Sequence, residues 1–142
     1  MAKKPKKPRY MWVYSPPKPP KPKAPDELKA EVEAQAQELV ESVLKPRCIK
    51  PPPKGMSLNY IVDIYTKWYR SYFYFCAKYA CPGPHAISPF FEAKYARMEY
   101  VGNRRFNLSY MRYTGEWIEL ETNLTVDKCL QKIKDDPYYF TC

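Results

Sequence analysis

The sequence predicts one small α+β domain, a five-stranded antiparallel β-meander with an N-terminal helix and a short C-terminal helix packed on one face. Two observations predict this fold class. Apolar residues first follow a helical spacing and then, over most of the remaining chain, alternate with period two. The 142 residues also begin with a proline-rich stretch, which leaves room for only one compact domain. We therefore expect an extended Pro/Lys tail over residues 1–25 and a single domain over residues 26–142.

The tail is basic as well as proline-rich. It contains eight prolines, seven lysines, one arginine and no acidic residue, so nearly all of the net charge of +9 lies there. Proline lacks a backbone N–H and favours polyproline II geometry, so this segment has no core of its own. An aromatic patch at residues 10–14 interrupts it, and we expect that patch to dock on something. The cations are Lys3, Lys4, Lys6, Lys7, Arg9, Lys18, Lys21 and Lys23, and the patch includes Trp12 and Tyr14.

A helix is predicted from Asp26 to about Leu44. Asp26 is expected to cap its N-terminus, and Pro46 to end it. A proline-rich run at residues 51–55 then provides a stiff connector. The apolar stripe that indicates the helix consists of Leu28, Val32, Gln35, Ala36, Leu39 and Val43.

Two strands that form a hairpin are predicted next. They are joined by a short connection around Thr66 to Arg70. The side chains expected on one face are Leu58, Tyr60, Val62 and Ile64 in the first strand, and Phe73, Phe75 and Ala77 in the second.

Three further strands and a closing helix complete the predicted fold. A proline-rich loop at residues 81–89 leads to a third strand near residues 93–100, with Ala96, Met98 and Tyr100 inward. Gly102-Asn103 and Thr114-Gly115 then turn the chain into strands at residues 106–113 and 117–121. Trp117 is expected to be buried against the helices. Thr125 is expected to cap the closing helix, whose stripe is Val126, Cys129, Leu130 and Ile133, and Pro137 to end it.

The order of these motifs resembles an uncharacterised bacterial domain family of unknown function, over roughly residues 30–140. The residues that carry the resemblance are Phe91-Glu92-Ala93-Lys94-Tyr95, Arg97 to Tyr100, Phe106 to Arg112, Gly115-Glu116-Trp117, and Asp135-Asp136-Pro137 with Phe140. The resemblance implies a fold and a bacterial source but no chemistry. The loop with Cys81 and His85 and the Pro/Lys tail both depart from the family pattern.

Catalysis and cofactor binding are not indicated. His85 is the only histidine and has no evident orienting partner, and the four glycines form no phosphate-binding loop. We expect no enzyme activity and no cofactor. Cys76, Cys81 and His85 are soft ligands, but their spacing is looser than that of a zinc site. We expect reduced, metal-free cysteines, although the sequence alone leaves open whether these three residues bind a metal.

The cysteines and the chain start also bear on location. Five cysteines are an odd number, and the N-terminus lacks the apolar stretch of a secretory signal. Lys or Arg interrupts every aromatic cluster, so no apolar run reaches the length of a membrane span. We expect a cytoplasmic protein without an integral membrane segment.

Nucleic-acid binding is the first functional hypothesis. The tail's cations can neutralise phosphates, and the second strand interleaves aromatic and basic residues that can stack bases. One face of these aromatics must also be core. We expect a non-enzymatic binding protein whose partner is nucleic acid or a ribonucleoprotein. The alternative is a small accessory subunit of a multiprotein assembly, whose tail threads onto a partner protein; attachment to a membrane surface is a minor alternative. Besides the tail's cations with Trp12 and Tyr14, the candidate residues are Arg70, Tyr72 and Tyr74.

Overall fold

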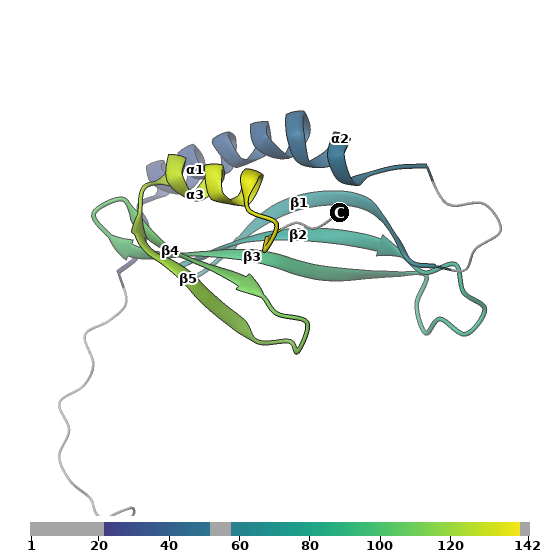
Figure 1. Cartoon of the computed structure of the whole chain (residues 1–142). Coiled ribbons are helices and arrows are strands. Elements are labelled where there is room, and N and C mark those ends of the chain that lie inside the picture. Colours follow the sequence, from purple (N-terminus) through teal and green to yellow (C-terminus); the bar gives the residue numbers. More distant parts are fainter. Residues whose placement is uncertain (1–21, 52–57, 140–142) are drawn as a thin grey trace, which may run out of the picture.

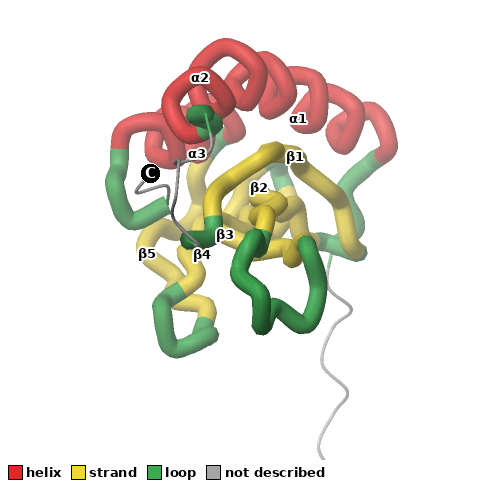
Figure 2. The backbone as a smooth tube through the Cα atoms, turned by 90° about the vertical axis from the view of Figure 1, so that its right-hand side faces the viewer, coloured by secondary structure: helices red, strands yellow, loops and turns green. Residues whose placement is uncertain are grey.

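The structure, a computed structural model, describes residues 22–51 and 58–139 and has two layers, helices over a sheet (Figure 1). The sheet is antiparallel and its strands lie in sequence order, which confirms the predicted five-stranded meander. The described helices all lie over the same face of the sheet (Figures 1 and 2), which confirms the α+β class. The strands are β1 (Tyr60–Tyr69), β2 (Tyr72–Ala80), β3 (Phe90–Gly102), β4 (Arg105–Met111) and β5 (Trp117–Leu124).

The N-terminal helix is longer than expected. It runs as α1 (Asp26–Leu39), a π-helical segment η2 (Val40–Leu44) and α2 (Lys45–Cys48). The prediction that Pro46 ends the helix is wrong. In η2 the N–H of Lys45 donates to the carbonyl of Val40, five residues back, so the helix widens before the proline. Pro46 then occupies the first turn of α2, where its missing N–H costs no hydrogen bond.

Two details of that helix also differ from expectation. Asp26 is the first helical residue and not the cap, since Pro25 holds the N-cap position without a side-chain bond. The stripe that contacts the sheet keeps a strict four-residue spacing. Its buried members are Leu28, Val32, Ala36, Val40, Leu44 and Cys48, whereas Gln35, Leu39 and Val43 flank it.

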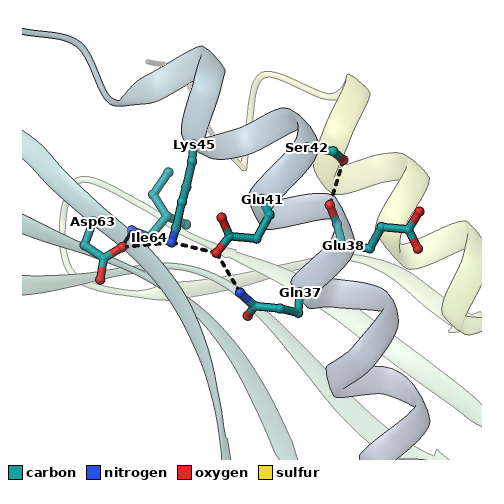
Figure 3. Close-up of polar contacts among 7 residues, drawn as sticks. All are labelled: Gln37, Glu38, Glu41, Ser42, Lys45, Asp63 and Ile64. Atoms are coloured by element: carbon teal, nitrogen blue, oxygen red, sulfur yellow. Dashed lines mark hydrogen bonds and ion pairs between the residues drawn. The ribbon is translucent and has the colours of Figure 1, made fainter.

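Polar contacts join the end of the N-terminal helix to the edge strand β1 through Lys45 of α2 (Figure 3). The Lys45 ammonium lies 2.8 Å from a Glu41 carboxylate oxygen and 3.3 Å from an Asp63 oxygen. Gln37 donates to the same Glu41 oxygen at 2.8 Å, and the backbone N–H of Ile64 donates to Asp63. Because the hydrogen bond to Glu41 stabilises the charged amine, the pKa of Lys45 is raised.

Bulges alter the predicted alternation in β1. The register shifts between Ile61 and Asp63, so Ile61 and Ile64 are buried and Leu58 is exposed. The prediction that Leu58, Tyr60, Val62 and Ile64 share one face is therefore wrong. The strand also continues to Tyr69, through the residues expected to form a connection, and its hairpin turn is Arg70-Ser71. In this longer strand Trp68 donates from its indole to the carbonyl of Lys29 in α1.

The core lies between the helices and one face of the sheet. The predicted inward residues of β2 and β3 are buried as expected. The closing helix α3 (Val126–Asp135) begins where Thr125 accepts a hydrogen bond from the N–H of Lys128, which confirms the predicted cap. The sheet's contributions to the core are Phe73, Phe75, Ala77, Ala96, Met98, Tyr100, Phe106 and Leu108; α3 adds Val126, Cys129 and Ile133.

Trp117 does not join this core. Its neighbour Ile118 pairs with Tyr110, whose ring contacts Tyr138 and Tyr139 near α3. Since successive side chains alternate across a strand, Trp117 points to the opposite face. The expectation of a tryptophan buried against the helices is therefore wrong.

The described chain begins at the end of the sheet that holds the β1–β2 turn. The carbonyl of Pro22 accepts a hydrogen bond from the Ser71 hydroxyl at 3.0 Å. Ala24 is buried, with 6% of its surface exposed. Residues 22–24, expected to belong to the tail, thus lie against the domain, while residues 1–21 are outside the described part of the chain.

Candidate functional site

The face of the sheet turned away from the described helices, the open face, gathers aromatic and basic side chains. Strand alternation places Tyr72 and Tyr74 there, because Phe73 and Phe75 point into the core. Arg97 lies opposite Tyr74 on β3, and Trp117 comes from β5. We call the five half-buried residues Tyr72, Tyr74, Lys94, Arg97 and Trp117 the open-face cluster.

Arg97 is the centre of the open-face cluster. Its guanidinium carbon lies 4.7 Å from the ring centroid of Tyr72 and 4.7 Å from that of Trp117. The small side chain of Ser109 lies opposite Arg97 on β4 and leaves room for the guanidinium to reach across to β5. Tyr74 contacts Trp117 at a centroid distance of 5.8 Å. Side chains from three strands, β2, β3 and β5, thus meet in one group.

Among the described residues, the guanidinium of Arg97 contacts aromatic rings and forms no ion pair with a carboxylate. Within residues 22–51 and 58–139, Arg97 forms no ion pair, and its buried Nε–H has no hydrogen-bond partner. A cation over an aromatic face is attracted by the ring quadrupole, which neutralises none of its charge. Lys94 adds a second cation, 5.7 Å from the Tyr74 centroid.

A Glu92 network lies beside the open-face cluster. Glu92 accepts hydrogen bonds from Tyr65 and from Lys67, the latter at 2.8 Å, and lies 3.6 Å from Lys94. The hydrogen bonds from Lys67 and Tyr65 lower the pKa of the Glu92 carboxyl. The bond between Lys67 and Glu92 also raises the pKa of Lys67. Burial, with the bond to Glu92, raises the pKa of the Tyr65 hydroxyl. One carboxylate therefore faces three donors.

The sequence identified only part of this surface. Tyr72 and Tyr74 lie in the open-face cluster. Arg70 is exposed in the β1–β2 turn with its guanidinium 5.3 Å from the Tyr69 ring, and Lys23 is exposed beside Pro22. Alternation along β3 could have found Arg97. Lys94 lies on the same face only because the register shifts between Phe75 and Cys76, which alternation does not predict, and Trp117 was assigned to the core. The other candidates lie outside the described residues: Lys3, Lys4, Lys6, Lys7, Arg9, Trp12, Tyr14, Lys18 and Lys21.

The cysteines differ in their surroundings. Cys48 is disulfide-bonded, so the expectation of reduced cysteines is wrong there, while Cys76, Cys81 and Cys129 are free. Burial raises the pKa of the Cys76 thiol to about 11 and that of Cys129 to about 12. Across the part of the chain that is described, no group of three or more His, Cys, Asp or Glu side chains is placed to hold a metal ion. His85 is exposed.

A second surface feature lies on the opposite side of the sheet. A hollow of about 490 Å³ is lined mainly by tyrosines, among them Tyr110, Tyr138 and Tyr139. The Tyr139 hydroxyl is buried and has no hydrogen-bond partner among the described residues, and burial raises its pKa. The described residues that line this hollow include no basic side chain, so its chemistry differs from that of the open-face cluster.

The fold defines a small α+β meander domain with helices on one face of its sheet and an aromatic, basic surface on the other. The chain belongs to the family described as Domain of unknown function (DUF3024), which it matches over residues 24–141. That match confirms the resemblance drawn from the sequence motifs. The comparisons with curated proteins and with solved structures return no match. Among the described helices, none is both long and apolar enough to cross a membrane.

Proposed function

We propose that this protein is a non-enzymatic binding protein whose partner is nucleic acid or a ribonucleoprotein. In this proposal the basic tail contacts phosphates, and the open-face cluster provides a second contact surface. The cations of the tail supply affinity that is independent of base sequence, because each phosphate contact releases condensed counterions. The domain positions the tail and adds aromatic contacts.

The observation that carries the proposal is the place where the tail joins the domain. Pro22, the first described residue, is hydrogen-bonded to Ser71, which immediately precedes Tyr72 of the open-face cluster. Arg70 and Lys23 are exposed at the same end of the sheet. A ligand that follows the cations of the tail would therefore meet Arg70 and then the open-face cluster.

Deleting residues 1–21 tests the role of the tail. The deletion removes seven of the tail's eight cations and leaves Pro22 and Ala24 in place. We expect affinity for nucleic acid to fall sharply at moderate salt. The slope of log affinity against log salt should also decrease, by about 0.7 to 0.9 for each cation that had neutralised a phosphate. Fluorescence anisotropy with labelled oligonucleotides at several salt concentrations measures both quantities. An unchanged affinity would contradict the proposal.

The alternative function is a subunit whose tail threads onto a partner protein. The variant Trp12→Ala distinguishes this alternative from nucleic-acid binding. This variant keeps every cation, so electrostatic binding of nucleic acid should survive with its salt slope intact. If a protein groove holds the aromatic patch instead, loss of Trp12 should cost about 2 kcal/mol or more of binding free energy to that protein. If the intact chain has no affinity for nucleic acid and Trp12→Ala weakens binding to a partner protein, the result would favour the subunit hypothesis.

A further inference from the structure

We infer that the open-face cluster is a stacking platform for the unpaired bases of single-stranded nucleic acid. The inference rests on the proposed function for its ligand class, nucleic acid, but not on the tail. It assigns the main stacking roles to Tyr74 and Trp117. Arg97 is a positioning residue that holds the Trp117 ring and that of Tyr72.

The rings of the open-face cluster stand on a rigid base. Tyr72 and Tyr74 alternate along β2 with Phe73 and Phe75, which have no exposed surface. Trp117 begins β5 and contacts Tyr74 at 5.8 Å. Rings fixed on paired strands lose little conformational freedom when a flat ligand stacks on them, and bases stack on such rings with about 1–3 kcal/mol per base.

The charges around the platform favour a polyanion on one side of it. Lys67, Lys94 and Arg97 lie on or beside the platform. Lys67 and Lys94 both contact the Glu92 carboxylate, and Arg97 forms no ion pair within the described residues. Two further acidic residues lie at the other margin of the platform. Glu99 is opposite Tyr72 in the strand register, and Glu119 is two residues after Trp117. The phosphates should therefore run over Lys67 and Lys94, with the bases directed toward Trp117.

The shape of the surface favours single strands over a duplex. The bases of a duplex are stacked on one another and hidden from a sheet surface, whereas unpaired bases can lie on exposed rings. In the structure the rings are half-buried side chains on a sheet, with Arg97 between two of them. Within the described part of the chain, this face presents rings on a sheet and no helix that could enter a groove.

The test uses the full chain and a labelled single-stranded thymidine oligonucleotide, with a duplex of equal length as comparison. Trp117→Ala and Tyr74→Ala should each weaken single-strand binding by about 5- to 150-fold, the loss of one stacked base. Their salt slopes should stay unchanged, because no charge is lost. Trp117→Phe keeps a ring and is the control for a folding defect in Trp117→Ala, and it should retain most of the affinity.

Arg97→Lys keeps the charge but not the planar guanidinium, so it should weaken single-strand binding at an unchanged salt slope.

Two matched controls lie away from the platform. Tyr138→Ala removes an exposed tyrosine on the helix side, and Lys128→Gln removes an exposed cation of α3. Both should bind as the unaltered chain does. Lys94→Gln, the matched platform variant for the charge, should weaken binding and lower the salt slope by about 0.7.

The outcomes separate the platform from the proposed function. If deletion of residues 1–21 abolishes binding while Trp117→Ala and Tyr74→Ala, both shown to be folded, leave single-strand affinity unchanged, the protein binds nucleic acid but the platform is refuted. Equal affinity for duplex and single strand would also overturn it. If the intact chain binds neither oligonucleotide at moderate salt, both proposals are wrong.

Discussion

Neighbouring residues of β2 have opposite surroundings. Phe73 is fully buried and contacts Trp68 at a centroid distance of 4.9 Å, whereas Tyr74 is half-buried on the open face. The pleat of the strand produces this contrast, because successive side chains point to opposite faces. Substitutions at the two positions should therefore affect different properties, stability at Phe73 and ligand binding at Tyr74.

Phe73→Ala should lower the free energy of unfolding by about 3–5 kcal/mol, as a large cavity in the core does. Tyr74→Ala should cost about 1 kcal/mol, because its ring gives up less buried surface and can be replaced by water. Urea denaturation monitored by circular dichroism measures both. Equal losses for the two variants would contradict the assigned faces.

The free cysteines should differ in their rates of alkylation. Cys76 and Cys129 have no exposed surface, and with a pKa of about 11 for Cys76, about a thousandth of that thiol is ionised at pH 8. Cys81 is only partly buried. Iodoacetamide at pH 8 should modify Cys81 in the native protein well before the other two, and mass spectrometry of proteolytic peptides can locate the label. Rapid labelling of Cys129 in the folded protein would contradict its burial.

At the scale of elements, the predictions from sequence succeeded where one local rule applied. The meander, the inward residues of β2 and the Thr125 cap follow from period-two alternation and cap chemistry, and all are confirmed. The helix around Pro46 and the bulge after Ile61 were missed, since both depend on how the backbone accommodates one residue. From sequence alone, Trp117 is expected in the core because tryptophan is a large apolar residue. The register of β5 decides which face it lies on, and that face is the open one.

Thr125→Ala should destabilise the protein by about 0.5–1 kcal/mol through loss of the α3 cap. The cap bond is long, at 3.4 Å, so the lower part of the known range applies. Thr114→Ala, in the exposed β4–β5 turn, is the matched control and should change stability by less than about 0.5 kcal/mol. Thermal unfolding of the two variants gives the comparison. A Thr125→Ala variant as stable as the control would show that the cap contributes nothing.

Glu92→Gln should alter how stability depends on pH. The folded pKa of Glu92 is lowered from its ordinary value of 4.5, so the carboxylate stabilises the fold above that value, and the contribution is lost as pH falls through the lower folded pKa. The difference in unfolding free energy between the unaltered chain and Glu92→Gln should therefore shrink from about pH 6 to about pH 3. Glu119→Gln, which removes a carboxylate that forms no ion pair within the described residues, serves as control. A difference independent of pH would contradict the network.

At the scale of the whole molecule, the described chain has one sheet face against helices and one without them, and it begins beside Ser71, which precedes Tyr72 of the second face. Composition placed the positive charge in the tail, and strand alternation placed Tyr72 and Tyr74 together. Neither could place Arg97 between Tyr72 and Trp117, because that contact spans three strands and depends on the room that Ser109 leaves. Sites assembled across strands need the register, which sequence patterns do not supply.

Two truncations should separate the tail from the domain. Deletion of residues 1–21 should leave the melting temperature nearly unchanged, since it keeps the Pro22–Ser71 hydrogen bond and the buried Ala24. Deletion of residues 1–25 removes both and should destabilise the domain by about 1–2 kcal/mol, the value of one such bond with one small buried side chain. Differential scanning calorimetry can measure the change. Identical melting temperatures would show that residues 22–25 contribute nothing to stability.

The strand order of the sheet has a consequence for how the chain folds. Every strand pairs with the strand that precedes or follows it in the sequence, so each new pairing closes only a short loop. For a sheet, such a topology has a lower contact order than one that pairs strands distant in the sequence, which favours faster folding. During synthesis, β1 and β2 can form a hairpin under α1 before β4 exists, and later strands can add one at a time. The edge of β3 should then stay unpaired until β4 emerges from the ribosome, and the edge of β4 until β5 does.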